Sequence, residues 1–319
     1  MKNKVAILIP TKNRSDFLIR QLRYYASVDS VHPIYIGDSS DENDKEKILS
    51  IINLLKNKLD IKYFHYPKEN GTEVINKVSF EIKEDYVAYN GDDDFLVPNS
   101  LSKCANFLNE NKDFRTAQGL ALIFSLSHEK NKAHGQFNWL DRYSRYPQSL
   151  ENTAKERLIS FSKNYWVPEP SVHRSKEWLE DIKNLDDVKD FTFAEYSRCF
   201  SFITSGKSKY IDCLYLLRQV HSHRIVIPQN TIGNNLWNKS YKIFLENIAK
   251  ILNKKDGLNF EEAKKIVDKQ FSENILPKLK SFQSKKNKKN FLRNIIQSNL
   301  SYKNVDILRK IKKILIMSD

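Results

Sequence analysis

The first hundred residues alternate between short apolar runs and amphipathic stretches. The apolar runs 5–9, 34–36, 61–66 and 86–89 predict four strands, and the first is continuous enough to be covered on both faces of a sheet. Between them, apolar residues at helical spacing predict a helix capped by Ser15 and helices over 45–59 and 72–82, with another opening over 101–108. Strands that alternate with single helices imply right-handed crossovers and a mostly parallel sheet.

Beyond residue 115 the pattern predicts longer elements. They are a strand over 116–126, a helix over 153–165, a helix over 191–204 ended by Gly206, and a strand over 210–220. From Leu236 onward it predicts helices over 240–253 and 260–274 and then a basic tail. We therefore expect an α/β fold in which a Rossmann-like sheet flanked by helices spans residues 1–230, followed by a helical C-terminal region over 231–319.

Composition supports a globular protein. Apolar residues make up 40% of the chain, enough to fill a core, and no run approaches 18 apolar residues. The N-terminus lacks the apolar stretch of a signal peptide, so we expect a cytoplasmic protein. Cys104, Cys199 and Cys213 are far apart and lack C-x-x-C spacing, which predicts buried thiols rather than a disulfide framework or a metal site.

The formal net charge of +14 is concentrated in the tail. Between Lys285 and Lys313 ten Lys or Arg stand against one acid, Asp306. In the same stretch Ile307, Leu308, Ile311, Ile314 and Leu315 repeat at helical spacing. Such a helix either lies on the anionic inner face of a membrane or packs on the protein with solvated lysines, and the sequence does not choose between the two.

Polar clusters follow each of the first four predicted strands. They are Thr11-Lys12-Asn13-Arg14, Asp38-Ser39-Ser40-Asp41, Asn70-Gly71 and Asp92-Asp93-Asp94. Because ligands bind where the carboxyl ends of parallel strands meet, these clusters predict one binding site.

Three adjacent carboxylates repel one another and need a compensating cation once they leave bulk water. A divalent Mg²⁺ or Mn²⁺ takes one or two protein carboxylates and fills its other positions with water and substrate phosphates. An acidic, solvated turn is the alternative for Asp92, Asp93 and Asp94. Likewise Asp38 either accepts from a nucleobase or ribose, or forms a turn.

The segments "VAILIPTKNRSDFL", "IYIGDSSDE" and "YVAYNGDDDFLVPNSL" resemble, in this order, the first, second and metal-binding segments of family 2 glycosyltransferases and their GT-A relatives. The likeness covers residues 4–110 well and 186–224 loosely. It implies a nucleotide-sugar donor, a UDP-sugar by expectation, and a divalent Mn²⁺ or Mg²⁺.

The resemblance also assigns roles to residues of the predicted site. Pro10, Thr11, Arg14 and Asn76 would bind the nucleotide-sugar, Asp38 the base, and Asp92 the ribose or the metal. Asp93 and Asp94 are the predicted metal ligands. Gly91 stands where the family carries its first acid, which leaves open which of the three aspartates binds the metal directly.

Transfer with inversion needs a carboxylate that accepts the proton of the acceptor hydroxyl. In the family this acid opens a helix eleven residues before a glycine, which is Glu195 ahead of Gly206 here. The family's acidic pair is Ala194-Glu195 in this chain, so Asp190 and Asp187 remain alternatives, as does a solvated helix acid.

Two further groups are candidates for substrate contacts. His221, His223 and Arg224 follow a predicted strand, and similar enzymes place such residues at the diphosphate; surface histidines without a role are the alternative. The three tryptophans of the region where an acceptor would bind offer faces for sugar rings, although core packing is the favoured role for any one of them. They are Trp139, Trp166 and Trp178.

We therefore expect an inverting, metal-dependent glycosyltransferase that acts on a hydroxyl of a glycan or lipid-linked acceptor in cell-surface polysaccharide synthesis. A sugar nucleotidyltransferase is a second reading, but the chain has no glycine before Gly37 to form a phosphate loop after its first strand. A basic nucleic-acid-binding protein is a third. It is disfavoured because the positive charge is terminal and the predicted cleft is acidic.

Overall fold

Four parallel strands form the first half of the central sheet. The computed structural model describes residues 3–126, 133–143, 147–183, 188, 190–221, 232–284 and 302–316. Strands β1 (Val5–Thr11), β2 (Ile34–Asp38), β3 (Ile61–His65) and β4 (Tyr86–Tyr89) lie in the order β3-β2-β1-β4. The helices α1 (Ser15–Ser27), α2 (Glu42–Leu55) and α3 (Gly71–Ser79) connect them. This confirms the α/β alternation predicted from the sequence.

The second half of the sheet is mixed. It adds β8 (Val172–Arg174), β6 (Phe114–Leu126), β9 (Lys207–Gln219) and β5 (Phe95–Leu96), while β7 (Phe137–Arg142) pairs with β6. Only β6 and β9 pair in parallel here; β8 is antiparallel to β4 and β6, and β5 to β9. The hydrophobic pattern predicted β6 and β9 but not β5, β7 or β8; β5 and β8 are too short to show a clear period, and β7 was not distinguished by its pattern.

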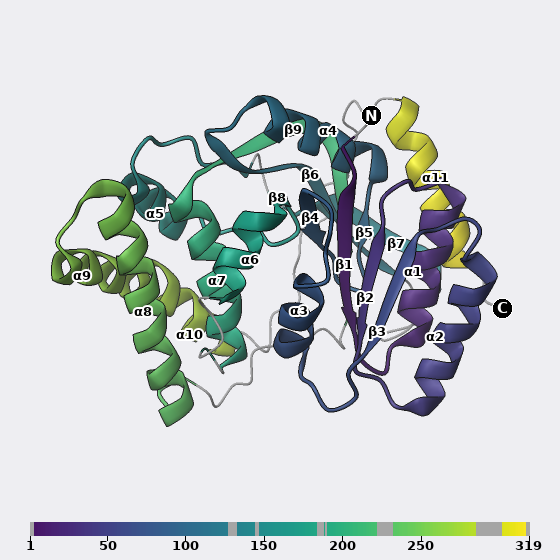
Figure 1. Cartoon of the computed structure of the whole chain (residues 1–319), viewed down its shortest axis with the longest axis horizontal. Helices are drawn as coiled ribbons and strands as arrows, with labels where there is room; N and C mark the ends of the chain where they lie inside the picture. The colour runs from purple at the N-terminus through teal and green to yellow at the C-terminus, as the bar shows by residue number, and fades with distance from the viewer. Residues whose placement is uncertain are drawn as a thin grey trace.

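Helices cover both faces of the sheet (Figure 1). The helices α1 and α2, with α4 (Pro98–Glu110) and α11 (Tyr302–Ile316), pack on one face, and α3, α6 (Ser175–Lys183) and α7 (Phe191–Ser205) on the other. Gly37 in β2 lets α3 approach closely, because a Cβ there would lie 2.2 Å from a methyl group of Val74. This close packing holds the first turn of α3 beside the carboxyl end of β2.

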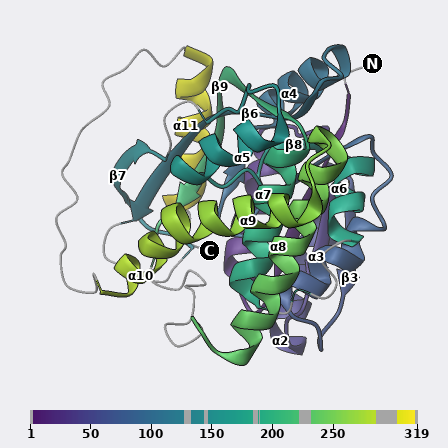
Figure 2. The same ribbon diagram turned by 90° about the vertical axis from the view of Figure 1, so that its left-hand side faces the viewer.

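A second core lies between helices. The helices α5 (Ala154–Lys163), α8 (Asn235–Asp256), α9 (Phe260–Gln270) and α10 (Leu276–Ser284), with the π-helical turn Phe271–Ile275, pack around α7 (Figure 2). Phe193, Phe200 and Phe244 are fully buried at its centre. The helix α7 ends at Gly206, as predicted. Because this core joins helices from both sides of residue 230, the division into two regions at that residue stays a prediction.

Several helices, among them α1, α2, α4 and α8, start elsewhere than the sequence predicts, and α1 and α2 show the reason. Ser15 is the first residue of α1 rather than its N-cap, and its backbone N–H donates to Asp44 Oδ1 at 3.0 Å. The helix α2 begins at Glu42 instead of residue 45, because the Asp41 side chain caps it by accepting from the Asp44 N–H. Both starts depend on polar contacts that precede the apolar periodicity, so the hydrophobic pattern does not show them.

The C-terminal helix α11 packs on the protein. Ile311 and Leu315 are fully buried beside α1, and Lys310 Nζ donates to the Ser27 carbonyl at 3.0 Å. The structure therefore agrees with the second reading of the tail, a helix docked on its own fold with its basic side chains exposed. Among the described residues, no helix is long and apolar enough to cross a bilayer. All three cysteines are buried and free, as predicted.

The docking of α11 predicts a large stability difference between two neighbouring residues. Leu315→Ala empties a fully buried position and should lower the free energy of unfolding by about 2–5 kcal/mol. Ile316→Ala, at a position 52% exposed, should change it by less than about 0.5 kcal/mol. Urea denaturation of both variants measures the difference. Equal effects would contradict the packing of α11 described above.

Candidate active site

The loop that follows β4 carries the three aspartates Asp92, Asp93 and Asp94, called here the acid loop. Its backbone is held by α1. Gln21 Nε2 donates to the carbonyls of Gly91 at 2.7 Å and Asp94 at 2.5 Å, and Arg20 Nη2 donates to the Asp93 carbonyl at 2.8 Å. The shape of the acid loop is therefore set by side chains about 70 residues earlier in the chain.

Arg20 joins the acid loop to two other segments, at Ala133 and at Gln219. Its guanidinium is fully buried, and Nη1 donates to the Ala133 carbonyl and to Gln219 Oε1, each at 2.5 Å. Burial lowers the pKa of Arg20 to about 10, so it stays protonated at neutral pH. The two residues that follow Ala133 contact α11. Gly135 N donates to the Leu315 carbonyl at 2.8 Å, and His134 Nδ1 lies 3.2 Å from the Ile314 carbonyl.

The carboxylates of Asp92 and Asp93 share one guanidinium. Arg14, the N-cap residue of α1, places Nη1 3.1 Å from Asp92 Oδ1 and Nη2 2.9 Å from Asp93 Oδ2. Thr11 Oγ1, at the end of β1, donates to Asp92 Oδ2 at 2.8 Å. His221 Nε2 lies 2.8 Å from Asp93 Oδ2. The structure thus brings together five residues assigned to one site from the sequence.

The third carboxylate anchors the loop to β9. Asp94 Oδ2 accepts from Arg218 Nε at 3.0 Å, and Asp94 Oδ1 accepts from the backbone N–H of Gln219 at 3.1 Å. The side chain of Asp94 is only 5% exposed. Both of its oxygens are therefore already engaged within the protein.

The environment separates the pKa values of Asp92 and Asp93. Burial raises the pKa of Asp92, and the neighbouring charge of Asp93 adds to this, against the lowering effect of Arg14. Burial also acts on Asp93, but the hydrogen bond with His221 and the charge of Arg14 outweigh it and lower its pKa. Asp93 is therefore the carboxylate that stays ionised.

The acid loop offers few ligands to a divalent cation. Among the described residues, no three His, Cys, Asp or Glu side chains are grouped so as to hold a metal. Asp93 is the most exposed of the three aspartates, and no described residue donates a hydrogen bond to its Oδ1. One free carboxylate oxygen suits Mg²⁺ or Mn²⁺ when water and phosphates fill the other positions. Of the two predicted metal ligands, Asp93 therefore fits better than Asp94.

The other residues predicted to bind the nucleotide-sugar lie on β1, β2 and α3. Asp38, opposite Thr11 in the sheet, is fully buried and forms the turn that was its alternative role: it accepts from the Ser40 N–H at 2.7 Å and from the Tyr63 hydroxyl at 2.6 Å. Pro10 is half-buried in β1. Asn76 lies half-buried on α3. No contact of Asn76 with the acid loop is seen in the described part of the chain.

Glu195 lies in the first turns of α7, within the electrostatic reach of the acid loop. Tyr165 donates to Glu195 Oε1 at 3.2 Å. Burial raises the pKa of Glu195, and the charge of Glu169 raises it further. Burial alone would lower the pKa of Arg218, but the charge of Asp94 above all, and also that of Glu195, raises it. The charge of Arg218 therefore interacts with the carboxylates of both Asp94 and Glu195.

The alternative candidates for the base differ in their surroundings. Asp190 is the N-cap of α7: its Oδ1 accepts from the Phe193 N–H at 3.1 Å, and its own N–H donates to Ser240 Oγ. Asp187, together with His223 and Arg224, lies outside the described residues. Asp190 therefore has a structural role that accounts for its burial.

The predicted tryptophans separate into different environments. Trp178 is buried in the core, where its Nε1 donates to Ser79 Oγ at 2.8 Å. Trp166 is half-buried beside a cavity. Trp139 belongs to β7, and its side chain is not among those described. Core packing thus holds for Trp178.

Sequence reasoning missed the residues that hold the acid loop. Arg20 and Gln21 lie on α1 between Leu18 and Leu22, and two polar side chains within a buried apolar stripe are the signal that could have identified them. Arg218 and Gln219 directly follow the apolar run that ends β9. The sequence prediction named His221 as a site residue, whereas Arg218 is the residue that carries a permanent charge.

Comparisons with known proteins agree with this geometry. The sequence model of the family described as Glycosyl transferase family 2 matches residues 6–162. These residues include β1, β4, the acid loop and Arg14. Residues 6–162, just under half of the chain, are similar to family 2 glycosyltransferases, and the structure has a GT-A-like fold. No protein of curated function matched it.

Solved structures of S. aureus TarS share the fold. TarS 1-349 in complex with UDP-GlcNAc aligns with a TM-score of 0.55 at 14% identity, covering 98% of this chain and 84% of that one. TarS 1-349 in complex with UDP aligns with a TM-score of 0.53 at 15% identity, covering 84% and 72%. The longer TarS structure aligns with a TM-score of 0.51 at 15% identity and covers 86% of this chain, which spans 44% of its length.

The support of the acid loop predicts a stability cost for losing Arg20. Arg20→Met leaves three buried acceptors without their donor and should lower the free energy of unfolding by at least about 2 kcal/mol. Arg309→Met, where the side chain is 77% exposed, is the matched control and should change it by less than about 0.5 kcal/mol. Denaturant unfolding of both variants measures this. A neutral Arg20→Met would show that the three contacts do not hold the loop.

Proposed function

We propose that this glycosyltransferase transfers a sugar from a UDP-sugar, with inversion and with the help of a divalent metal, to a hydroxyl of a glycan or lipid-linked acceptor. The observation that carries the proposal is the acid loop itself. Asp93 has a lowered pKa, receives no hydrogen bond on Oδ1 from the described residues, and lies beside Arg14 and His221 at the carboxyl ends of β1 and β4.

The donor side of the proposal is supported by charge and by fold. Cleavage of a sugar–phosphate bond places negative charge on the departing diphosphate, and positive groups fixed nearby stabilise that charge. A metal held by Asp93 would supply Lewis-acid chemistry there. The guanidinium of Arg14 is 23% exposed at the same place. The TarS structures with UDP and UDP-GlcNAc share this fold, which supports a UDP-sugar as the donor.

Glu195 is proposed as the general base. A base works best when its pKa is close to the working pH, and burial moves the pKa of Glu195 upward in that direction. The carboxylate of Glu195 accepts the proton of the acceptor hydroxyl, and the tyrosine hydroxyl of Tyr165 fixes its orientation. Asp190 is less suited because its carboxylate caps α7.

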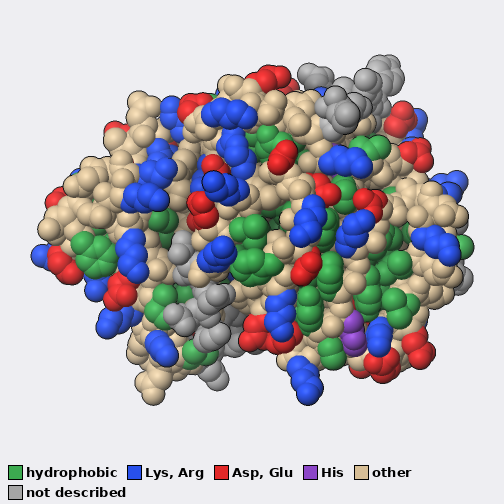
Figure 3. Space-filling model, viewed as in Figure 1, with side chains coloured by type: hydrophobic (Ala, Val, Ile, Leu, Met, Phe, Trp, Pro, Cys, Tyr) green, Lys and Arg blue, Asp and Glu red, His purple; other side chains and the backbone are tan. Residues whose placement is uncertain are grey.

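The place of action belongs to the same proposal. The acceptor would belong to cell-surface polysaccharide synthesis, and the enzyme would bind it at the inner face of the membrane. This location is supported by four exposed basic side chains of α11, Arg309, Lys310, Lys312 and Lys313. The apolar face of α11 is buried, so only electrostatic attraction is left for such a contact. On the face seen in Figure 3, Lys and Arg are interspersed with Asp and Glu rather than gathered in one groove, which does not favour nucleic acid as a partner.

Binding of donor and metal should depend on Asp93. With UDP or UDP-GlcNAc and Mn²⁺ at about a hundred times their dissociation constants, the wild-type protein should gain about 2.7 kcal/mol of stability. Asp93→Ala should lose this metal-dependent gain in a thermal-shift measurement while keeping its own fold. Asp113→Ala, which removes an aspartate that is 62% exposed, should keep it. A wild-type gain in Asp93→Ala would exclude Asp93 as the ligand.

Catalysis should depend on Glu195 and not on Asp190. Glu195→Gln should lower kcat by about 10²–10⁴-fold and leave UDP binding intact, because the amide cannot accept the proton. Asp190→Asn keeps a cap of equal quality and should retain activity. In the wild type, kcat/KM should fall as the pH drops through the raised pKa of Glu195, above the usual glutamate range. Loss of activity in Asp190→Asn but not in Glu195→Gln would show that Asp190 is the general base.

A further inference from the structure

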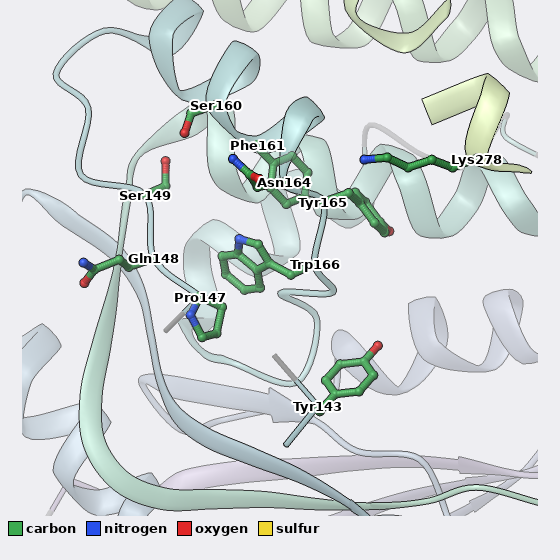
Figure 4. Close-up of a pocket in the computed structure, with 10 residues that line it drawn as sticks. All are labelled: Tyr143, Pro147, Gln148, Ser149, Ser160, Phe161, Asn164, Tyr165, Trp166 and Lys278. Atoms are coloured by element: carbon green, nitrogen blue, oxygen red, sulfur yellow. The ribbon is translucent and has the colours of Figure 1, made fainter. Parts of the chain in front are cut away.

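A cavity of about 530 Å³ lies outside the acid loop, between the sheet and the helical region (Figure 4). Its lining includes Tyr143 just after β7, Gln148 in the segment that leads to α5, Tyr165 and Trp166 in the loop after α5, and Lys278 in α10. None of these five residues contacts Asp92, Asp93 or Asp94 in the hydrogen bonds and ion pairs described above.

Two lining residues connect the cavity to the catalytic groups. The hydroxyl of Tyr165 donates to Glu195 Oε1 at 3.2 Å. The ring of Tyr143 lies under the guanidinium of Arg218, 4.8 Å from its Cζ, and Arg218 in turn donates to Asp94. Tyr165 therefore links the cavity to the proposed base, and Tyr143 links it through Arg218 to the acid loop.

The lining combines an aromatic wall with exposed amides. Trp166 is half-buried and meets Phe161 edge-on, with ring centroids 5.9 Å apart and planes at 88°. Gln148 and Asn164 are exposed at the cavity, and each amide can both donate and accept. An aromatic ring that covers the C–H face of a sugar, next to amides that bond its hydroxyls, is a set suited to carbohydrate. A purely apolar ligand would leave these amides without partners.

We propose that this cavity is the acceptor subsite and that it takes a carbohydrate ring stacked on Trp166. The inference rests on the proposed function, because it uses Glu195 as the base. In the step, the acceptor hydroxyl gives its proton to the Glu195 carboxylate and its oxygen forms a bond to C1 of the donor sugar. The bond from C1 to the diphosphate oxygen breaks, and its electron pair leaves with UDP.

The test compares acceptor and donor kinetics in tryptophan variants. The probes are p-nitrophenyl glycosides of common hexoses and N-acetylhexosamines, offered with UDP-GlcNAc and other common UDP-sugars. Trp166→Ala should raise the acceptor KM at least tenfold, with UDP affinity and the slow hydrolysis of the donor unchanged. Trp166→Phe should restore most of the acceptor affinity. Phe80→Ala, which removes an aromatic side chain 48% exposed on another surface, is the control and should behave as wild type.

The outcomes separate the subsite from the proposed function. An acceptor KM in Trp166→Ala within twofold of the wild type overturns the subsite. So does a wild type that hydrolyses a UDP-sugar but glycosylates none of the probes, and in both cases the proposed donor chemistry stands. A protein that neither binds UDP nor hydrolyses any UDP-sugar refutes the proposed function itself, and the subsite is refuted with it.

Discussion

Three consecutive carboxylates, of which Asp92 and Asp94 are buried and Asp93 is half-buried, are the constraint on which this structure depends. Desolvated acids are costly unless positive charge is brought to them. Here guanidinium groups supply it: Arg14 bridges Asp92 and Asp93, and Arg218 pairs with Asp94. Because Arg14 comes from α1 and Arg218 from β9, the acid loop is stable only when both ends of the catalytic fold are in place. The ion pairs that hold the site therefore also join the two ends of the fold.

The first half of the fold could be predicted from the sequence because each element there carries its own period. Continuous apolar runs such as Val5–Ile9 are the signature of strands buried on both faces, and α1 to α3 alternate with them. The strands β5 and β8 could not be predicted, since two or three residues hold no period and their pairing is decided by distant partners. The start of α1 was misplaced because a residue in another helix, Asp44, takes the hydrogen bonds of Ser15.

The candidate site divides in the same way. Thr11, Arg14 and Asp92 follow strands and resemble family segments, so their meeting could be expected. The side chains that hold the loop could not: Arg20 reaches Gln219, 199 residues away, and no local pattern encodes such a contact. Gly91 departs from the family pattern, and the structure gives this a physical meaning. A Cβ there would lie 2.8 Å from Asp93 Oδ1, the oxygen proposed to bind the metal, so the missing side chain leaves room beside that oxygen.

The link from α11 through residues 133–135 to Arg20 also orders events in time. A ribosome makes β1, α1 and the acid loop long before it makes residues 302–316, and domains fold as they emerge. The nascent N-terminal sheet can therefore form while the last brace on its donor loop is still unsynthesised. The hydrogen bond between Gly135 and Leu315 can form only after α11 has been made, so a chain that stops before α11 would lack this support of its donor loop.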